Sequence, residues 1–417
     1  MGPALQRAVA SPGEGIVLPG RNCWHVERAD RVRCVQDAAD YFRWVRRALL
    51  GAQRSIFILG WDLQAIDLLP AADRDPGAAA AARRDREPDG PTRLDAVLAH
   101  VARRHRRLRA SILIWDYDAL YTLERDPFLR WRLGWRTPRH VRFGFDDRHP
   151  PGASHHQKLV VVDDAIAFCG SIDLTTHRYD TCSHGIEDPH RTTTTGTAYG
   201  PYHEVGLMVS GPVAARLGAL ARDRWRTSQV DSGKVPPVAD LPAAGDLWPA
   251  DAAPDLTDVE VAIARTLPEF GSQPAVRECE TLHLDTIGAA RRSIYIESQY
   301  FTSEVLGDAL AARLREPDGP EVIVVVPREC YGWLERNTMG AFREGVFLRM
   351  AAADTHGRLR LLHPMASRQR DVATFIHSKV LIADDVLLRI GSANFARRSM
   401  GMDSECDLAV DASHDPG

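Results

Sequence analysis

Two histidine–lysine pairs stand at identical places in a pattern that this chain contains twice. Each copy reads H-x-K, four apolar or small residues, Asp, six further residues and then Gly-Ser. The members of the two copies are His156, Lys158, Asp163, Gly170 and Ser171, and then His377, Lys379, Asp384, Gly391 and Ser392. One such pattern arises easily by chance, but two with the same spacing indicate a duplicated enzyme that draws one histidine from each half.

Paired imidazole and ammonium groups are suited to phosphoryl transfer. Lysine ammonium groups bind the non-bridging oxygens of a phosphate as point charges. One neutral imidazole attacks phosphorus and forms a phosphohistidine, while the other, protonated, donates to the leaving alkoxide and then activates water or an alcohol. We therefore predict a phosphodiester-cleaving site made of His156, Lys158, His377 and Lys379 that needs no metal and no cofactor.

Each catalytic imidazole also needs a partner that fixes its tautomer. Glu204 and Glu405 occupy analogous places in the two halves, each immediately before a strand-like run. We predict that these two glutamates orient the histidines, although an ordinary polar role for both stays open.

The apolar run after each H-x-K, an Asp-Asp pair and a second apolar run together predict a β-hairpin. We expect the first aspartate of each pair to anchor the hairpin turn. We expect the glycines to let the backbone approach the phosphate, and the serines either to donate a hydrogen bond to it or to be structural. The residues concerned are Asp163, Asp384, Gly170, Gly391, Ser171 and Ser392.

A second repeat supports the duplication, because residues 52–58 resemble residues 290–296 and each precedes its own H-x-K copy. Strand-like and helix-like patterns alternate in both halves, which predicts two similar α/β sandwich lobes related by a pseudo-twofold axis. The predicted division is an N-terminal segment (1–29), a first lobe (30–227), a linker (228–260) and a second lobe (261–417).

Composition limits the class of protein. The chain has 417 residues, 26% of them charged, a net charge of −4 and seven cysteines without a C-x-x-C pair. This balance argues against a general nucleic-acid binder, a disulfide framework and a zinc site built on cysteine pairs. The sequence contains no apolar run long enough to span a bilayer and no signal-peptide core. We expect a cytoplasmic protein that meets membranes peripherally, and a monomer suffices because one chain holds both histidines.

The two copies resemble the signature of the phospholipase D superfamily, and the resemblance extends over nearly the whole chain. Residues 170–180, 295–301 and 391–405 are similar to segments of phosphatidylcholine-type phospholipases D, although Tyr202-His203-Glu204 departs from a Trp-His-Asp segment of the family. The resemblance implies that His156 is the nucleophile, that His377 is the general acid and that the substrate is a glycerophospholipid. It also implies a phosphate site, to which we assign Lys158, Ser171, Asp173, Lys379, Ser392 and Asn394.

Other functions remain open at this stage. Cardiolipin synthase-like phosphatidyl transfer uses the same motifs, and a nuclease would need a basic groove. Two arginine clusters, at 103–109 and 130–139, are candidates for that groove, but a solvated face explains them more simply. A scaffold with a dead fold is disfavoured because both copies are complete. The expected partner is a phospholipid membrane surface rather than nucleic acid, and residues 331–334 with Phe342, Val346 and Phe347 are either interfacial anchors or core.

Overall fold

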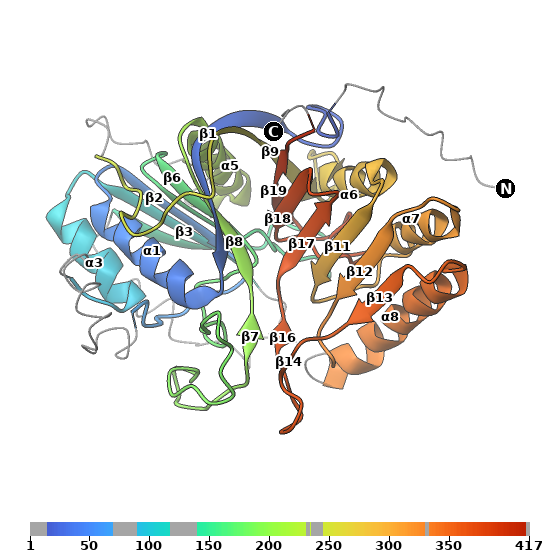
Figure 1. The fold of residues 1–417 in the computed structure, drawn as a ribbon. Helices are drawn as coiled ribbons and strands as arrows, with labels where there is room; N and C mark the ends of the chain where they lie inside the picture. Colours follow the sequence, from blue (N-terminus) through green and yellow to red (C-terminus); the bar gives the residue numbers. More distant parts are fainter. Residues whose placement is uncertain are drawn as a thin grey trace.

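The computed structural model describes residues 15–69, 90–116, 140–230, 234, 245–329 and 333–413. One 15-stranded sheet runs through this part of the chain, with helices packed against it (Figure 1). In sheet order the strands are β13 (Leu359–Leu362), β12 (Glu321–Val325), β11 (Ser293–Ser298), β17 (Lys379–Ala383), β18 (Leu387–Gly391), β19 (Glu405–Asp411), β9 (Leu256–Leu267), β1 (His25–Gln36), β8 (Val205–Ser210), β6 (Ile166–Gly170), β5 (Leu159–Val162), β2 (Ser55–Gly60), β3 (Arg109–Trp115) and β4 (Val141–Asp146), with β10 (Val276–Arg277) paired to β9.

The two halves of the sheet have the same arrangement of strands, counted from the outer edge toward the centre. At each edge three strands are parallel, and the remaining strands toward the centre are antiparallel. The long central strands β1 and β9 pair antiparallel with each other, from His25 opposite Ile263 to Val32 opposite Leu256. The register also repeats, because Ile56 pairs with Val162 in the first half as Ile294 pairs with Ala383 in the second. The predicted pair of similar α/β lobes is therefore confirmed, with their sheets joined edge to edge at β1 and β9.

Successive side chains on the strands of the first half point to opposite faces of the sheet and belong to two separate hydrophobic cores. Val160 and Val162 of β5 pack with the helices α1 (Ala38–Gly51) and α3 (Leu94–Arg104). Leu159 and Val161 point to the other face and pack with α5 (Pro212–Ser228). This division is the consequence of the two-residue period of a strand. The hydrophobic run of β5 is thus buried on both sides and fixes the position of the motif just before it.

The second half has a core of its own, formed with α6 (Glu278–Ala289), α7 (Glu304–Arg315) and α8 (Trp333–Ala353). The core under α5 spans both halves, since Cys406 and Leu408 of β19 share it with Val161 of β5. Two short sheets complete the structure: β14 (Met365–Ser367) with β15 (Val372–Ala373), and β7 (Tyr202–His203) with β16 (Phe375–Ile376). The second of these joins the two halves.

The Asp-Asp pairs form the hairpin turns that the sequence predicts. Asp163 and Asp164 both have a φ of 56°, and Asp384 and Asp385 have φ values of 56° and 58°. The amide of Ala165 donates to the carbonyl of Val162 and closes the first turn. Positive φ at both central residues is the pattern of a type I′ turn, which favours the twist of a hairpin and tolerates Asp.

The predicted domain boundaries stay a prediction, although β9 begins at Leu256, inside the predicted linker. In the described part of the chain no helix combines the length and the apolarity that crossing a bilayer requires.

Candidate active site

The backbone around each H-x-K motif pairs with the opposite half of the molecule. The amide of His156 donates to the carbonyl of Ser404 at 2.9 Å, and His155 forms a parallel bridge with Ser404. In the same way the amide of His377 donates to the carbonyl of His203 at 2.8 Å, beside the β7–β16 pair. Ser404 directly precedes Glu405 and His203 directly precedes Glu204. The backbone pairing therefore places each H-x-K motif beside the glutamate of the other half.

The side chains follow this exchange. His156 Nδ1 lies 2.9 Å from Glu405 Oε2 and 3.1 Å from its Oε1. His377 Nδ1 hydrogen-bonds Glu204 Oε1. Both carboxylates are fully buried, and Glu405 also accepts a bond of 2.5 Å from the hydroxyl of Ser392. Each histidine is therefore held through Nδ1 by a carboxylate from the other lobe, which is the orienting contact expected of the two glutamates.

The two lysines lie under the same site. Lys158 Nζ donates to the carbonyl of His156 at 3.1 Å, and Lys379 Nζ donates to the carbonyl of His377. Lys158 also pairs with Asp173, whose Oδ2 lies 3.1 Å from Nζ. Burial, and then the charge of Lys158, hold the pKa of Lys379 well below its usual value. The two ammonium groups are thus close enough to repel each other, and a bound anion would relieve that repulsion.

Burial dominates the titration of the histidines and their glutamates. Burial, and then the charges of Lys158 and Lys379, lower the pKa of His156 well below its usual value, and burial and Lys379 do the same to His377. Burial raises the pKa of Glu204 and of Glu405 to about 8. All four shifts have burial as their largest cause, because burial disfavours the charged form of each group.

The motif aspartates bind backbone rather than facing the histidines. Asp163 accepts from the amides of residues 53, 54 and 55 at 2.7–2.8 Å, just before β2. Asp384 accepts from the amides of residues 291, 292 and 293 at 2.5–2.8 Å, just before β11. These contacts fit the anchoring role, and they also account for the second repeat, since its two copies supply the amides.

The motif glycines lie where two neighbouring strands come very close together. A Cβ on Gly170 would lie 2.4 Å from the Cα of Gly206, and one on Gly391 would lie 2.0 Å from Asp407 Oδ1. The two glycines thus let β6 approach β8 and β18 approach β19. That they also let the backbone approach a phosphate stays a prediction.

The motif serines and Asp173 are also engaged within the protein. Ser171 Oγ donates to the carbonyl of Val205 and accepts from its amide, at 3.0 and 3.1 Å. Ser392 Oγ donates to Glu405 and accepts from the amide of Cys406 at 3.0 Å. Asp173 accepts from the amide of Trp61 at 2.9 Å besides pairing with Lys158. These contacts give all three residues partners within the protein, and their assignment to phosphate binding stays a prediction.

Asn394 stays a candidate phosphate ligand. Its backbone amide donates to the hydroxyl of Ser399 at 3.1 Å, and its side-chain Oδ1 lies 3.5 Å from Ser298 Oγ. Asn394 directly precedes Phe395, whose backbone amide donates to Ser298 Oγ at 3.0 Å. The side chain is 3% exposed.

Sequence reasoning gave no role to Arg178 or to Tyr202. The guanidinium of Arg178 lies 4.0 Å from Glu204 and 3.9 Å from Asp173, and it donates to the hydroxyl of Tyr202. The ring of Tyr202 lies 5.7 Å from that of His377 and stacks on Phe375. Both residues stand in segments that carry the family resemblance, but no repeated spacing singles them out.

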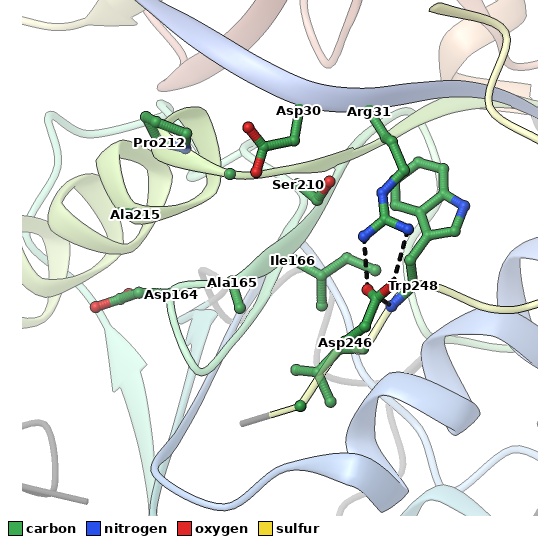
Figure 2. A pocket seen from close by; sticks show the side chains of 13 residues that line it. Asp30, Arg31, Asp164, Ala165, Ile166, Ser210, Pro212, Ala215, Asp246 and Trp248 are labelled. Carbon is green, nitrogen blue, oxygen red and sulfur yellow. Dashed lines mark hydrogen bonds and ion pairs between the residues drawn. The ribbon is translucent and has the colours of Figure 1, made fainter. Parts of the chain in front are cut away.

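A cavity of about 420 Å³ lies at the far end of the first hairpin and is distinct from this site (Figure 2). Its lining includes Asp164 and Ala165 of the turn and the Arg31–Asp246 ion pair. The four residues of β5 lie between Lys158 and Asp163 of that turn, and five steps at the rise of a strand make roughly 17 Å. The cavity therefore does not belong to the histidine site.

The first arginine cluster also lies away from the histidines. Arg103, Arg104, Arg106 and Arg107 are exposed where α3 leads into β3. Arg109 opens β3 opposite Ser55, whereas the motif end of the sheet is where Leu59 meets Leu159. The second cluster lies in residues 117–139, outside the described residues.

The proposed interfacial anchors divide between surface and core. Phe342 is 63% exposed on α8, while Val346 is buried and Phe347 packs partly against the second-half core. The side chains of residues 331–334 lie outside the described part of the chain.

Comparisons with known proteins address the same two halves. Residues 151–307 match the family model described as "Phospholipase D", and residues 283–415 match the one described as "Cardiolipin synthase, PLD-like domain". Each match contains one H-x-K copy with its hairpin. The chain belongs to the phospholipase D superfamily.

Similar curated members of the superfamily are longer than this chain. It is 23% identical to phospholipase D A of Dictyostelium discoideum, over 91% of this chain and 32% of that protein. It is 24% identical to phospholipase D1 of Schizosaccharomyces pombe, over 91% of this chain and 33% of that protein. Cardiolipin synthase A of Yersinia pseudotuberculosis is 24% identical over 61% of this chain and 44% of that protein. The chain thus spans about a third of the length of the two phospholipases D.

A solved structure supports the fold of this superfamily member. Phosphatidylserine synthase from Haemophilus influenzae superposes with a TM-score of 0.56 at 12% identity, over 93% of this chain and 84% of that one. At that identity the likeness concerns the fold alone.

Proposed function

We propose that this protein transfers the phosphatidyl group of a glycerophospholipid to water or to an alcohol through a phosphohistidine intermediate. The exchanged His–Glu pairs carry the proposal. Because Glu405 and Glu204 occupy Nδ1 of His156 and His377, the Nε2 atom of each ring is the one left to meet a substrate. Lys158 and Lys379, whose Nζ atoms donate to the carbonyls of His156 and His377, are the proposed ligands of the phosphate oxygens.

In the proposed first step, Nε2 of His156 attacks phosphorus and the bond from phosphorus to the head-group oxygen breaks. His377 donates its Nε2 proton to the leaving oxygen, so the head group departs as an alcohol. In the second step His377 takes a proton from water or an alcohol, whose oxygen attacks phosphorus as the P–N bond breaks. The products are phosphatidic acid with water and a new phosphatidyl ester with an alcohol. His156 is the more accessible ring, with 14% of its side chain exposed against 5% for His377.

The names of the curated relatives support a phospholipid as substrate: two are phospholipases D and one is a cardiolipin synthase. We propose that these reactions differ in the acceptor, and that the chemistry at His156 is common to them. The position of the first arginine cluster, away from the histidines, favours this substrate over a nucleic acid.

The test is head-group release from mixed phospholipid vesicles with ethanol present and no chelator added. We expect phosphatidic acid and phosphatidylethanol from the wild type, and a loss of about 10²–10⁴-fold or more in His156→Ala and His377→Ala. His356→Ala, which removes an exposed imidazole, is the matched control and should keep full activity. Vesicles of phosphatidylglycerol alone test the synthase alternative, in which cardiolipin accumulates. A folded wild type that acts on no phospholipid would refute the proposal.

A further inference from the structure

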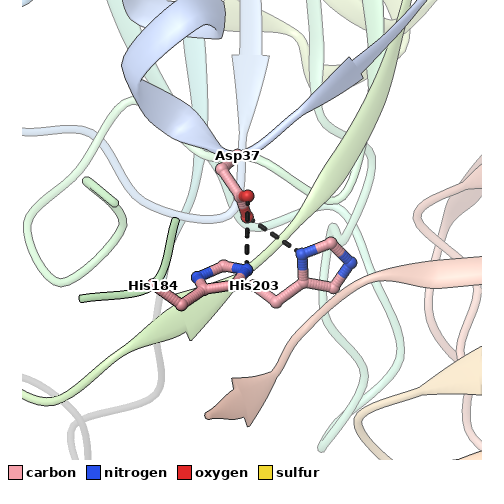
Figure 3. Close-up of side chains that lie close together, drawn as sticks. All are labelled: Asp37, His184 and His203. Carbon is pink, nitrogen blue, oxygen red and sulfur yellow. Dashed lines mark hydrogen bonds and ion pairs between the residues drawn. The ribbon is translucent and has the colours of Figure 1, made fainter. Parts of the chain in front are cut away.

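Three side chains next to the site form a cluster that the proposed reaction does not use. Asp37, His184 and His203 offer one carboxylate oxygen and two imidazole nitrogens that all lie within 4.8 Å of one another (Figure 3). They come from the end of β1, from the segment between β6 and β7, and from β7 itself. We propose that these three residues bind a first-row divalent metal ion, for which zinc is the probe.

The spacing of the donor atoms fits such an ion. Asp37 Oδ1 lies 3.0 Å from His203 Nδ1, and Asp37 Oδ2 lies 3.4 Å from His184 Nε2. Zinc binds imidazole nitrogen and carboxylate oxygen at about 2.0–2.2 Å, so tetrahedral ligand atoms stand about 3.3 Å apart. Two imidazoles and one carboxylate suit zinc and its first-row neighbours rather than calcium or magnesium, which prefer oxygen ligands.

The second nitrogen of each ring is held as metal-binding histidines require. His184 Nδ1 lies 3.1 Å from Asp180 Oδ2, and His203 Nε2 lies 3.3 Å from Glu297 Oε2. A carboxylate on the remote nitrogen fixes the tautomer and turns the other nitrogen toward the ion. Here both rings have such a carboxylate, and both turn the other nitrogen toward Asp37.

Asp37 has an unusual backbone conformation, and its side chain does not cap the helix that follows it. It stands at the N-cap of α1, where an aspartate ordinarily binds the first amides of the helix, but its side chain makes no such bond. Its φ of 61° and ψ of 160° lie in a region that is otherwise essentially confined to glycine. The buried carboxylate is directed at the two imidazoles, and partial exposure of His184 (21%) leaves a way in for an ion.

The duplication provides an internal comparison. Val205 pairs with Gln36 in the first half as Cys406 pairs with Arg265 in the second, so Asp37 corresponds to Thr266. His203, which precedes Glu204, corresponds likewise to Ser404. At these positions the second half has neither a carboxylate nor an imidazole, and Thr266 lies inside β9 without the positive φ of Asp37. The duplicated fold alone therefore does not call for the cluster.

An ion at this place would stabilise one catalytic pair. The carbonyl of His203 accepts from the amide of His377, and the amide of Glu204 donates to Asp37 at 3.1 Å. The ion would tie the segment that carries His184 to the strand that presents Glu204. The proposal concerns binding and does not depend on the reaction.

The competing state is a proton in place of the ion. Burial alone would lower the pKa of His203, but its hydrogen bonds to Asp37 and Glu297 raise that pKa to about 10. A protonated His203 between two carboxylates would then hold the cluster together without a metal.

Metal content of the full chain decides between the two. The wild type, stripped with chelator and reloaded with zinc, should retain one equivalent after dialysis by elemental analysis and unfold at a higher temperature than the stripped protein. His184→Ala should lose the retained zinc, and Glu297→Gln, which keeps all three ligands, should bind it about 10- to 100-fold more weakly. His190→Ala, in the same segment, is the control that should match the wild type. Retention below a tenth of an equivalent, or equal retention in His184→Ala, would overturn the proposal; because no lipid is involved, this result is independent of the phospholipase test.

Discussion

Replacing the two buried glutamates by glutamine, one at a time, tests the exchange of partners between the halves. Glu405 binds Nδ1 of His156 with both oxygens, at 2.9 and 3.1 Å, and Glu204 binds Nδ1 of His377. Glutamine nearly preserves shape but removes the charge. If His156 is the nucleophile, Glu405→Gln should impair formation of the phosphohistidine, and Glu204→Gln should impair the proton transfers of His377.

The size of the effect follows from the lost contact. A hydrogen bond to a charged group contributes about 1.5–3 kcal/mol. Each 1.36 kcal/mol corresponds to a factor of ten in rate, so each substitution should slow its own step about 10- to 150-fold. Losses of this size are smaller than those expected for removing either imidazole, and they leave enough activity to resolve the individual steps.

An activated substrate separates the two steps. A p-nitrophenyl phosphodiester has a leaving group that needs little protonation, so the first step no longer depends strongly on His377. In rapid mixing, Glu204→Gln should release a fast burst of one equivalent of p-nitrophenol and then turn over slowly. Glu405→Gln should show a slow first turnover and no burst. The reverse pattern, a burst in Glu405→Gln and none in Glu204→Gln, would refute the cross-lobe pairing together with the roles assigned to the histidines.

Four further substitutions, with Gly200→Ala as a control, test the scaffold by urea unfolding. Asp163→Ala, which removes a 3% exposed acceptor of three amides, should cost about 3 kcal/mol, and Asp384→Ala, which is more exposed, should cost less; equal small losses would contradict the anchoring role. Gly170→Ala places a Cβ against backbone and should destabilise severely, whereas Gly200→Ala meets nothing within 4 Å and should not. Burial would raise the pKa of Asp146, but a buried arginine partner outweighs it and lowers the pKa to about 2, so its contribution of about 2 kcal/mol is present above pH 4 and is lost as the pH falls toward 2. Asp146→Asn should flatten that part of the wild-type stability curve, and an unchanged slope would count against the ion pair.

The sequence by itself was enough to identify the repeated motif, the duplication and the family. His156 and His377, each with a lysine two residues on, can be identified because a complete pattern recurs at one spacing. The apolar runs after them predicted the hairpins, since a strand buried on both faces is apolar at every position. The motif spacing and the apolar runs depend only on residues that are close together in the sequence. They can therefore be recognised without knowing any contact between distant segments.

Only the tertiary structure decided which groups meet. Glu405 is 249 residues from His156 and Glu204 is 173 residues from His377, and the choice of partner depends on how the two lobes join at β1 and β9. The motif glycines likewise show their purpose only when the neighbouring strand is in place. Contacts between segments so far apart are fixed by the packing of buried surfaces rather than by local spacing. The cluster of Asp37, His184 and His203 could not be found in the sequence for the same reason.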